Sequence, residues 1–108
     1  YGFVFFNCKL TCESGTASNS VWLGRPWCPS GTDVNKPAVA YINCNMGAHI
    51  KKEGWTSMSG VDPSHGRFYE YNSSGSGAAI NSSRPQLNSF QVANYTKSNV
   101  LGGWNPSF

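Results

Sequence analysis

Val4-Phe5-Phe6-Asn7-Cys8 aligns residue by residue with Ala40-Tyr41-Ile42-Asn43-Cys44, and more loosely with Phe68-Tyr69-Glu70-Tyr71-Asn72. Each segment places aromatic and β-branched residues, which favour strands, ahead of an asparagine, which favours a corner. Strand repeats at irregular spacing, with loops of variable length between them, are typical of a parallel β-solenoid. The alternative is an antiparallel sandwich, which would need tight hairpins, yet no Asn-Gly or Asp-Gly dipeptide joins the strands. The sequence therefore favours an all-β chain built in parallel coils.

Strands, loops and one helix can be predicted along the rest of the chain. Strands are expected over Val4–Leu10, Ala38–Asn43 and Arg67–Tyr71, with exposed loops over Ser14–Ser20 and Cys28–Pro37. A single helix is predicted over Asn88–Val100, capped by Asn88 or Ser89, and lying across the end of the solenoid. Leu101–Phe108 should then pack as a tail along the coils. Residues 1–108 are thus expected to form a single partial domain, in which residues 88–108 are the helix and tail.

Composition limits the class of protein. The chain has 108 residues, few charged side chains (12%) and a formal net charge of +3. This composition suits a secreted, turn-rich β protein. Its basic residues are scattered, which argues against nucleic acid as a partner, and no apolar run is long enough to span a membrane. The chain opens in mid-strand at Tyr1, so we expect a fragment of a longer protein.

Four cysteines leave three complete disulfide pairings open. Cys8 and Cys44 occupy equivalent places in two repeats, and stacked strands would bring their Cα atoms to about 4.8 Å, which a disulfide tolerates. Stacked free thiols are the favoured interpretation, because buried free cysteine is common. A zinc site is not expected, since no Cys-x-x-Cys pair occurs and His49 and His65 lie far away in sequence.

Leu23-Gly24-Arg25-Pro26-Trp27 is the stretch with the clearest chemistry. Gly24 permits a turn or a close approach, and Pro26 fixes its own φ while favouring an extended Arg25. The segment would hold out a guanidinium, which pairs with carboxylates, beside an indole, which offers a flat apolar face. A sugar acid needs both kinds of contact.

This stretch is the first of five blocks that occur in a fixed order: residues 23–27, Gly54–Gly60 with its Trp-x-x-Met-Ser-Gly run, Arg67–Tyr71, Gly75–Ala79 and Leu101–Pro106. The series covers nearly the whole chain and resembles the C-terminal part of the pectin methylesterases, or pectinesterases, of the bacterial type. The resemblance implies a right-handed parallel β-helix and a secreted, extracellular or periplasmic, aspartyl esterase of the carbohydrate esterase class. It also implies hydrolysis of methyl esters in polygalacturonate (pectin) during cell wall modification, without metal or cofactor.

The resemblance also suggests roles for four residues. Arg25 matches the arginine that orients the family's nucleophilic aspartate, and a neighbouring cation lowers the pKa of such a carboxyl group. Trp27 matches a tryptophan that supports the sugar, and Met58 matches a methionine that contacts substrate in bacterial members. Ser30 stands where bacterial relatives often carry threonine, so its hydroxyl is a candidate substrate contact. Met58 could instead fill the core.

The two catalytic aspartates of the family lie in Gln-Asp-Thr and Asp-Phe-x-Phe-Gly segments, and neither segment occurs here. Asp33 and Asp62 match neither pattern. We therefore expect the chain alone to be inactive and to depend on the remaining N-terminal part of the same enzyme. An uncovered N-terminal coil would also favour self-association.

Two other functions fit the same residues. Trp27 and neighbouring aromatic residues could form the stacking platform of a non-catalytic carbohydrate-binding module, or the coils could be a structural solenoid segment without a sugar site. The remaining tryptophans, Trp22, Trp55 and Trp104, are expected to pack rather than to bind.

Overall fold

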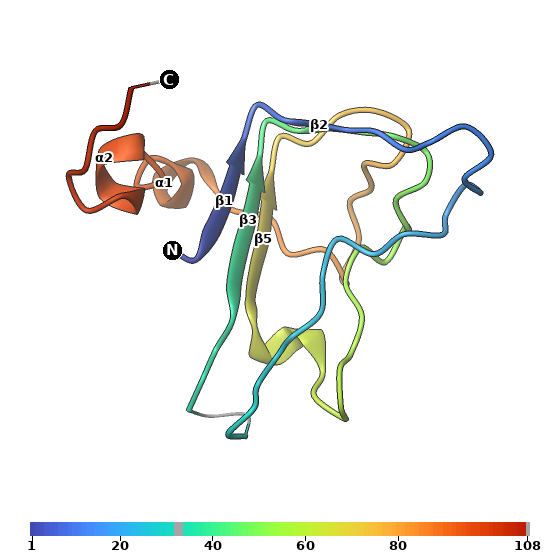
Figure 1. Ribbon diagram of the computed structural model, residues 1–108, viewed down its shortest axis with the longest axis horizontal. Coiled ribbons are helices and arrows are strands. Elements are labelled where there is room, and N and C mark those ends of the chain that lie inside the picture. Colours follow the sequence, from blue (N-terminus) through green and yellow to red (C-terminus); the bar gives the residue numbers. More distant parts are fainter. Residues whose placement is uncertain (32–33, 108) are drawn as a thin grey trace.

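The computed structural model describes residues 1–31 and 34–107. The strands are β1 (Phe3–Phe6), β2 (Lys9–Leu10), β3 (Ala38–Ile42), β4 (Asn45–Met46) and β5 (Arg67–Tyr71). The helical segments are the 3-10 turn η1 (Pro63–His65) and the short α-helices α1 (Ser89–Val92) and α2 (Lys97–Val100). Strands β1, β3 and β5 form one parallel sheet and β2 and β4 form another. Figure 1 shows the first sheet as three strands side by side in chain order. This arrangement confirms the parallel β-helix and excludes the antiparallel sandwich.

Asparagines make the corner between the two sheets. Asn7, Asn43 and Asn72 adopt left-handed backbone conformations, with φ of 54°, 54° and 53°. Asparagine tolerates this region better than most residues. Asn72 Nδ2 also donates a hydrogen bond to Asn43 Oδ1 at 2.9 Å, so the corners of successive coils are joined through their side chains. The corner at Asn7 divides the strand expected over Val4–Leu10 into β1 and β2.

The inward face of the β1–β3–β5 sheet carries the core. Aromatic rings stack along the coil axis: Phe5 on Tyr41 with centroids 4.7 Å apart, and Trp55 on Phe68 with centroids 4.5 Å apart. The buried members of this cluster are Leu23, Tyr41, Cys44, Met46, Ile50, Trp55 and Phe68. Because side chains alternate along a strand, the neighbouring positions face outward and need a separate cover.

The C-terminal segment covers that outward face. Ala40 and Ile42 are buried there with Leu87, and Val92 and Tyr95 pack against them. The helices therefore lie beside the sheet (Figure 1), where we had expected one helix across the end of the coils. The predicted helix is also interrupted, because Thr96 caps a second one, its Oγ1 accepting from the backbone of Asn99.

The start of α1 follows the sequence-based expectation. Asn88 is its N-cap and forms a reciprocal capping box with Gln91. Just before it, residues 85–87 pair with β5, since Glu70 N donates to Pro85 O at 3.0 Å and Leu87 N donates to Glu70 O at 2.8 Å. This short extension covers the last strand edge, which was the role expected of the helix.

The three tryptophans that were predicted to pack differ in their exposure to solvent. Trp55 is 3% exposed, as predicted for a packing residue. Trp22 is 37% exposed and lies under the Lys51 ammonium, which is 4.7 Å from the ring centroid. The prediction was wrong for Trp104, which is 66% exposed. In Figure 1 the tail lies beside the two short helices and not along the coils. The predicted tail residue Phe108 and the loop residue Asp33 lie outside the described residues.

All four cysteines are free. Cys8 and Cys44 lie in neighbouring coils. A hydrogen bond from Asn45 N to Cys8 O, at 2.9 Å, joins these two coils. Cys44 is fully buried, and this burial raises the pKa of its thiol. The two residues are therefore stacked free thiols, as favoured from the sequence.

Candidate functional site

Two segments distant in sequence are brought together by a parallel bridge between Gly24 and Trp55. Leu23 N donates to Gly54 O at 2.6 Å, and Thr56 N donates to Gly24 O at 3.1 Å. A Cβ atom at Gly24 would lie 3.1 Å from the Trp55 ring, so glycine allows the chain to cross the core tryptophan closely. The bridge fixes Gly24, just before Arg25, against Trp55, three residues before Met58, on adjacent coils.

A surface hollow of about 220 Å³ follows this bridge. Its lining residues are Pro26, Trp27, Cys28, Pro29, Met58, Ser59 and Val61. Trp27 is 68% exposed and offers a broad aromatic surface, whereas Met58 is partly buried. Met58 and Val61 exchange two backbone hydrogen bonds, of 3.1 and 2.9 Å, which hold the thioether side of the hollow in a tight turn. The structure thus unites two of the four site residues predicted from the sequence.

Arg25 lies at the start of this segment but does not line the hollow. Its side chain is exposed, and within residues 1–31 and 34–107 it forms no hydrogen bond or ion pair. Pro26, which follows it, is fully buried and anchors the segment to the coils. The guanidinium is therefore held near the hollow by the backbone and has all its donors available.

Ser30 lies outside the hollow as well. It is exposed on the turn in which Gly31 N donates to Cys28 O at 3.2 Å. Its hydroxyl is accessible, but the described part of the chain gives it no contact with Trp27 or Met58.

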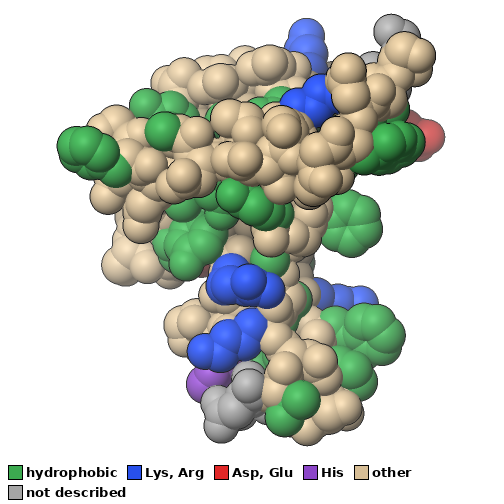
Figure 2. Space-filling model, turned by 90° about the vertical axis from the view of Figure 1, so that its left-hand side faces the viewer, with side chains coloured by type: hydrophobic (Ala, Val, Ile, Leu, Met, Phe, Trp, Pro, Cys, Tyr) green, Lys and Arg blue, Asp and Glu red, His purple; other side chains and the backbone are tan. Residues whose placement is uncertain are grey.

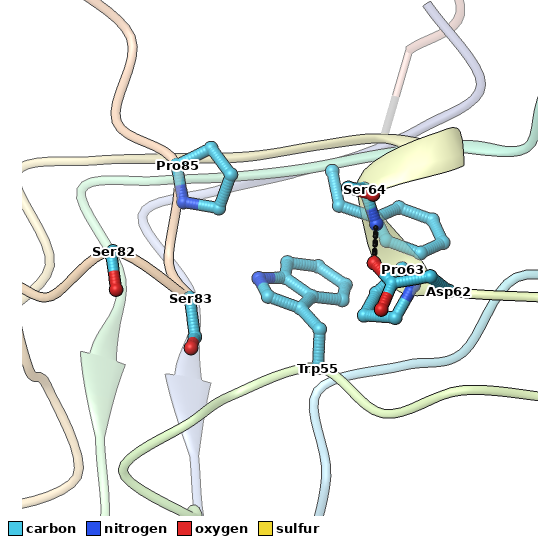
Figure 3. Close-up of a pocket in the computed structure, with 8 residues that line it drawn as sticks. Trp55, Asp62, Pro63, Ser64, Ser82, Ser83 and Pro85 are labelled. Atoms are coloured by element: carbon cyan, nitrogen blue, oxygen red, sulfur yellow. Dashed lines mark hydrogen bonds between the residues drawn. The ribbon is translucent and has the colours of Figure 1, made fainter.

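A second hollow, of about 230 Å³, lies between residues 62–64 and residues 82–85 (Figure 3). Trp55 forms its floor, and Asp62 and Ser83 stand on opposite sides. Asp62 Oδ1 accepts from Ser64 N at 2.9 Å, and this backbone hydrogen bond lowers the pKa of the Asp62 carboxyl group. Asp62 thus caps the 3-10 turn. The indole Nε1 of Trp55 is buried and finds no partner among the described residues.

Sequence reasoning missed one buried charged pair. Glu70 and Arg84 are each fully shielded from solvent and joined by two hydrogen bonds, of 2.6 and 2.7 Å. Inward placement of Glu70 could have been read from the alternation along β5, but a loop arginine 14 residues later carries no periodic signal.

No group of three or more His, Cys, Asp or Glu side chains in residues 1–31 and 34–107 could hold a metal ion. In the same ranges, no helix is both long enough and apolar enough to cross a bilayer.

Comparisons with known proteins agree on one family. A family model described as Pectinesterase matches residues 1–103. Pectinesterase A of Dickeya chrysanthemi is 39% identical over 99% of this chain, which covers 34% of that protein. The solved structure of a pectin methylesterase in complex with a hexasaccharide superposes with a TM-score of 0.90 at 37% identity, covering 100% of this chain and 36% of that one.

A pectin methylesterase structure from Erwinia chrysanthemi gives a TM-score of 0.88 at 38% identity, covering 99% of this chain and 36% of that one. The chain spans about a third of the length of the curated bacterial relatives it matches. Because the match extends over nearly all of its residues, in sequence and in structure, the chain belongs to the pectinesterase family.

Proposed function

We propose that this chain supplies the C-terminal coils of a secreted pectin methylesterase, which hydrolyses galacturonate methyl esters to free carboxylate and methanol. The family match and the solved relative in complex with a hexasaccharide support this proposal. A carboxylate nucleophile, a proton donor for methanol and donors for the oxyanion are needed for such a reaction. In this proposal upstream coils provide them, and the present residues hold the nucleophile and the sugar.

Arg25 acts on the nucleophile. Its guanidinium grips the carboxylate of an upstream aspartate and keeps it ionised, because an adjacent cation favours the charged form. Trp27 and Met58 form the wall against which a sugar ring lies, the indole giving a flat face and the thioether adapting to an uneven apolar surface. Ser30, exposed on the following turn, offers a hydroxyl to the polymer.

One observation carries the proposal: an exposed arginine without a partner in the described chain immediately precedes a hollow lined by Trp27 and Met58. A structural solenoid has no need of this combination, because solvent-exposed apolar surface next to an unpaired cation adds little to stability. The weak positive charge, visible as more basic than acidic side chains on the face shown in Figure 2, also suits an acidic polymer.

The test is a fusion enzyme, in which residues 1–108 are joined behind the part of Dickeya chrysanthemi pectinesterase A that precedes the matched region. Methanol release from esterified pectin should be measurable in the fusion enzyme. Arg25→Ala should reduce kcat on the order of a hundredfold, the scale seen when one positioned electrostatic group is removed. The matched control is Arg67→Ala, since the Arg67 side chain is also exposed but, within the described residues, donates its one hydrogen bond to Lys36 O, at 3.0 Å. Equal activity in both variants would contradict the proposal.

The isolated chain should release no methanol and should self-associate. Among the described residues, strand β1 pairs with β3 alone and its other edge has no partner, and Phe3, the first residue of β1, is 76% exposed. Light scattering should give a mass that rises with concentration, whereas a constant monomeric mass would contradict this. Saturable binding of oligogalacturonate by the isolated chain would instead favour the carbohydrate-binding module. A secreted or periplasmic location follows from the polymeric substrate, and fractionation of the source cells tests it.

A further inference from the structure

Two backbone hydrogen bonds hold the two residues that precede Arg25, although residues 25–28 have no regular secondary structure. Leu23 N donates to Gly54 O at 2.6 Å, and Thr56 N donates to Gly24 O at 3.1 Å. Both bonds belong to the pairing of adjacent coils, and any sequence in this fold could make them. The carbonyl oxygen of Leu23, in the peptide between these two residues, takes part in neither bond. Its partner is a side chain, which the sequence must specify.

That side chain is Tyr41, whose hydroxyl donates to the carbonyl oxygen of Leu23 at 3.1 Å in buried surroundings. The phenol comes from β3, on the inward face of the sheet. Its ring lies between Phe5, with centroids 4.7 Å apart, and Trp55, with centroids 5.9 Å apart. Tyr41 is only 8% exposed, and its ring is held on both sides by aromatic neighbours. The hydroxyl therefore points towards the backbone of Leu23, two residues before Arg25.

We propose that Tyr41 is a positioning residue for Arg25: its hydroxyl fixes the Leu23–Gly24 peptide, and that peptide sets the direction in which the guanidinium leaves the coils. This inference rests on the proposed function, because it assumes that Arg25 grips a catalytic carboxylate. Arg25 has no side-chain partner of its own in the described chain, so its placement depends on the backbone behind it. Tyr41 is not itself a catalytic residue, since a buried ring beneath the sheet touches neither substrate nor nucleophile.

The chemistry of the phenol suits this task. Burial is the largest of the effects that raise the pKa of Tyr41 to about 12, so the hydroxyl keeps its proton and remains a donor at neutral and mildly alkaline pH. Phenylalanine at this position would preserve the ring stack and remove only the donor. The Leu23 carbonyl would then lose this buried partner, and the segment would gain freedom near the site.

The first test is Tyr41→Phe in the fusion enzyme, with Tyr71→Phe as the matched control. Tyr71 lies on the outward face of the same sheet and has no hydroxyl contact like that of Tyr41 among the described residues. We expect kcat to fall roughly tenfold to a hundredfold in Tyr41→Phe, because displacing a catalytic group by about 1 Å has effects of this size. KM should stay nearly unchanged, since Arg25 acts on the nucleophile. An unchanged kcat in a folded Tyr41→Phe variant would overturn the inference.

A double-mutant cycle separates positioning from general stability. If Tyr41 acts through Arg25, Tyr41→Phe should have little further effect on kcat when Arg25→Ala is already present. Losses that simply multiply would show that the hydroxyl acts elsewhere and would overturn the proposal.

The last measurement does not depend on activity. Amide hydrogen exchange in the 108-residue chain should become faster around residues 22–27 in Tyr41→Phe and should not change there in Tyr71→Phe. If exchange responds but the fusion enzyme is inactive, the proposed function fails while the structural role of Tyr41 stands. If exchange does not respond, Tyr41 does not hold this segment.

Discussion

Glu70 and Arg84 form an ion pair that solvent does not reach, with Arg84 Nη2 2.6 Å from Glu70 Oε1 and 0% exposure of either side chain. Arg84 Nε donates to the second carboxylate oxygen at 2.7 Å, and Nη1 donates to Gly77 O at 2.8 Å. Ser73 Oγ adds a further bond to the carboxylate at 3.0 Å. The pair thus joins β5 to the loop that follows it, with nearly every polar atom satisfied.

Breaking this pair from one side should be costly. Arg84→Met leaves the Glu70 carboxylate buried without its cation, and the expected loss in the free energy of unfolding is about 3–5 kcal/mol. Urea unfolding measures it, and Arg67→Met at an exposed position should change stability by less than about 0.5 kcal/mol. The double replacement Glu70→Met/Arg84→Met should recover much of the loss. A single-mutant loss below about 1 kcal/mol would show that the pair opens to water.

The asparagine corner gives a second prediction. Asn43 combines a φ of 54° with a side-chain hydrogen bond from Asn72. Asn43→Val should destabilise the chain by more than about 2 kcal/mol, because a β-branched residue is strained in the left-handed region. The side-chain hydrogen bond from Asn72 is also lost. Asn43→Gly keeps the backbone conformation and should cost less. Urea unfolding of both variants checks the order, and equal losses would mean that the backbone conformation is not limiting.

The sequence predicted this fold well where the repeats carry it. Aligning Asn7 with Asn43 anticipated the parallel register of β1 on β3 and the corner, because equivalent residues in a solenoid perform equivalent tasks in every coil. The looser alignment of Phe68–Asn72 was wrong by one residue: Ala40 pairs with Tyr69 rather than with Phe68. The repeats did not reveal that the corner splits a strand, since the run up to Leu10 looks continuous in composition. Arg84 was missed for a related reason. Its partner Glu70 lies in a strand, where side chains alternate between inside and outside, but a loop residue such as Arg84 has no such alternation from which burial could be predicted.

The candidate site was predicted in part. Trp27 and Met58 meet in one hollow because their segments are paired through Gly24 and Trp55. Family resemblance implied that both residues contact substrate, but no local signal in the sequence indicated the pairing itself. Ser30 lies outside the hollow because the turn at Gly31 carries it away. The exposed Trp104 shows the limit of composition, because an aromatic residue near a chain end is not thereby buried.

Alkaline pH tests the environment of Tyr41. Its pKa is raised from 10.0 to about 12, so the unfolded chain loses this proton at lower pH than the folded chain. The stability from this difference is present below pH 10 and lost as pH rises from 10 to 12, at most about 2–3 kcal/mol. The stability gap between the chain and Tyr41→Phe should shrink over that interval, measured by urea unfolding at each pH. The difference in unfolding free energy between the chain and Tyr71→Phe serves as the control. A difference for Tyr41→Phe that stays constant with pH would contradict burial of the phenol.

Thiol labelling tests the stacked cysteines. Cys12 is exposed, whereas Cys44 is fully buried, and this burial raises the pKa of its thiol and so disfavours the thiolate. Because the thiolate is the reactive form, iodoacetamide should modify Cys12 readily and Cys44 only after urea unfolding. Peptide mass spectrometry separates the two sites. Equal labelling of both without urea would show that the interior is open at Cys44.

Two exposed tryptophans allow a matched test of the sugar wall. Trp27 is 68% exposed and lines the hollow with Met58, whereas Trp104 is 66% exposed and lies in the tail. If a sugar covers the indole, Trp27→Ala in the fusion enzyme should cost about 1.5 kcal/mol of binding, or a rise in KM of roughly tenfold. Met58→Ala should raise KM less, and its effect should overlap with that of Trp27→Ala because both residues contact one ring. Trp104→Ala should leave KM unchanged. An equal rise in KM for Trp27→Ala and Trp104→Ala would show that the sugar does not bind at the hollow.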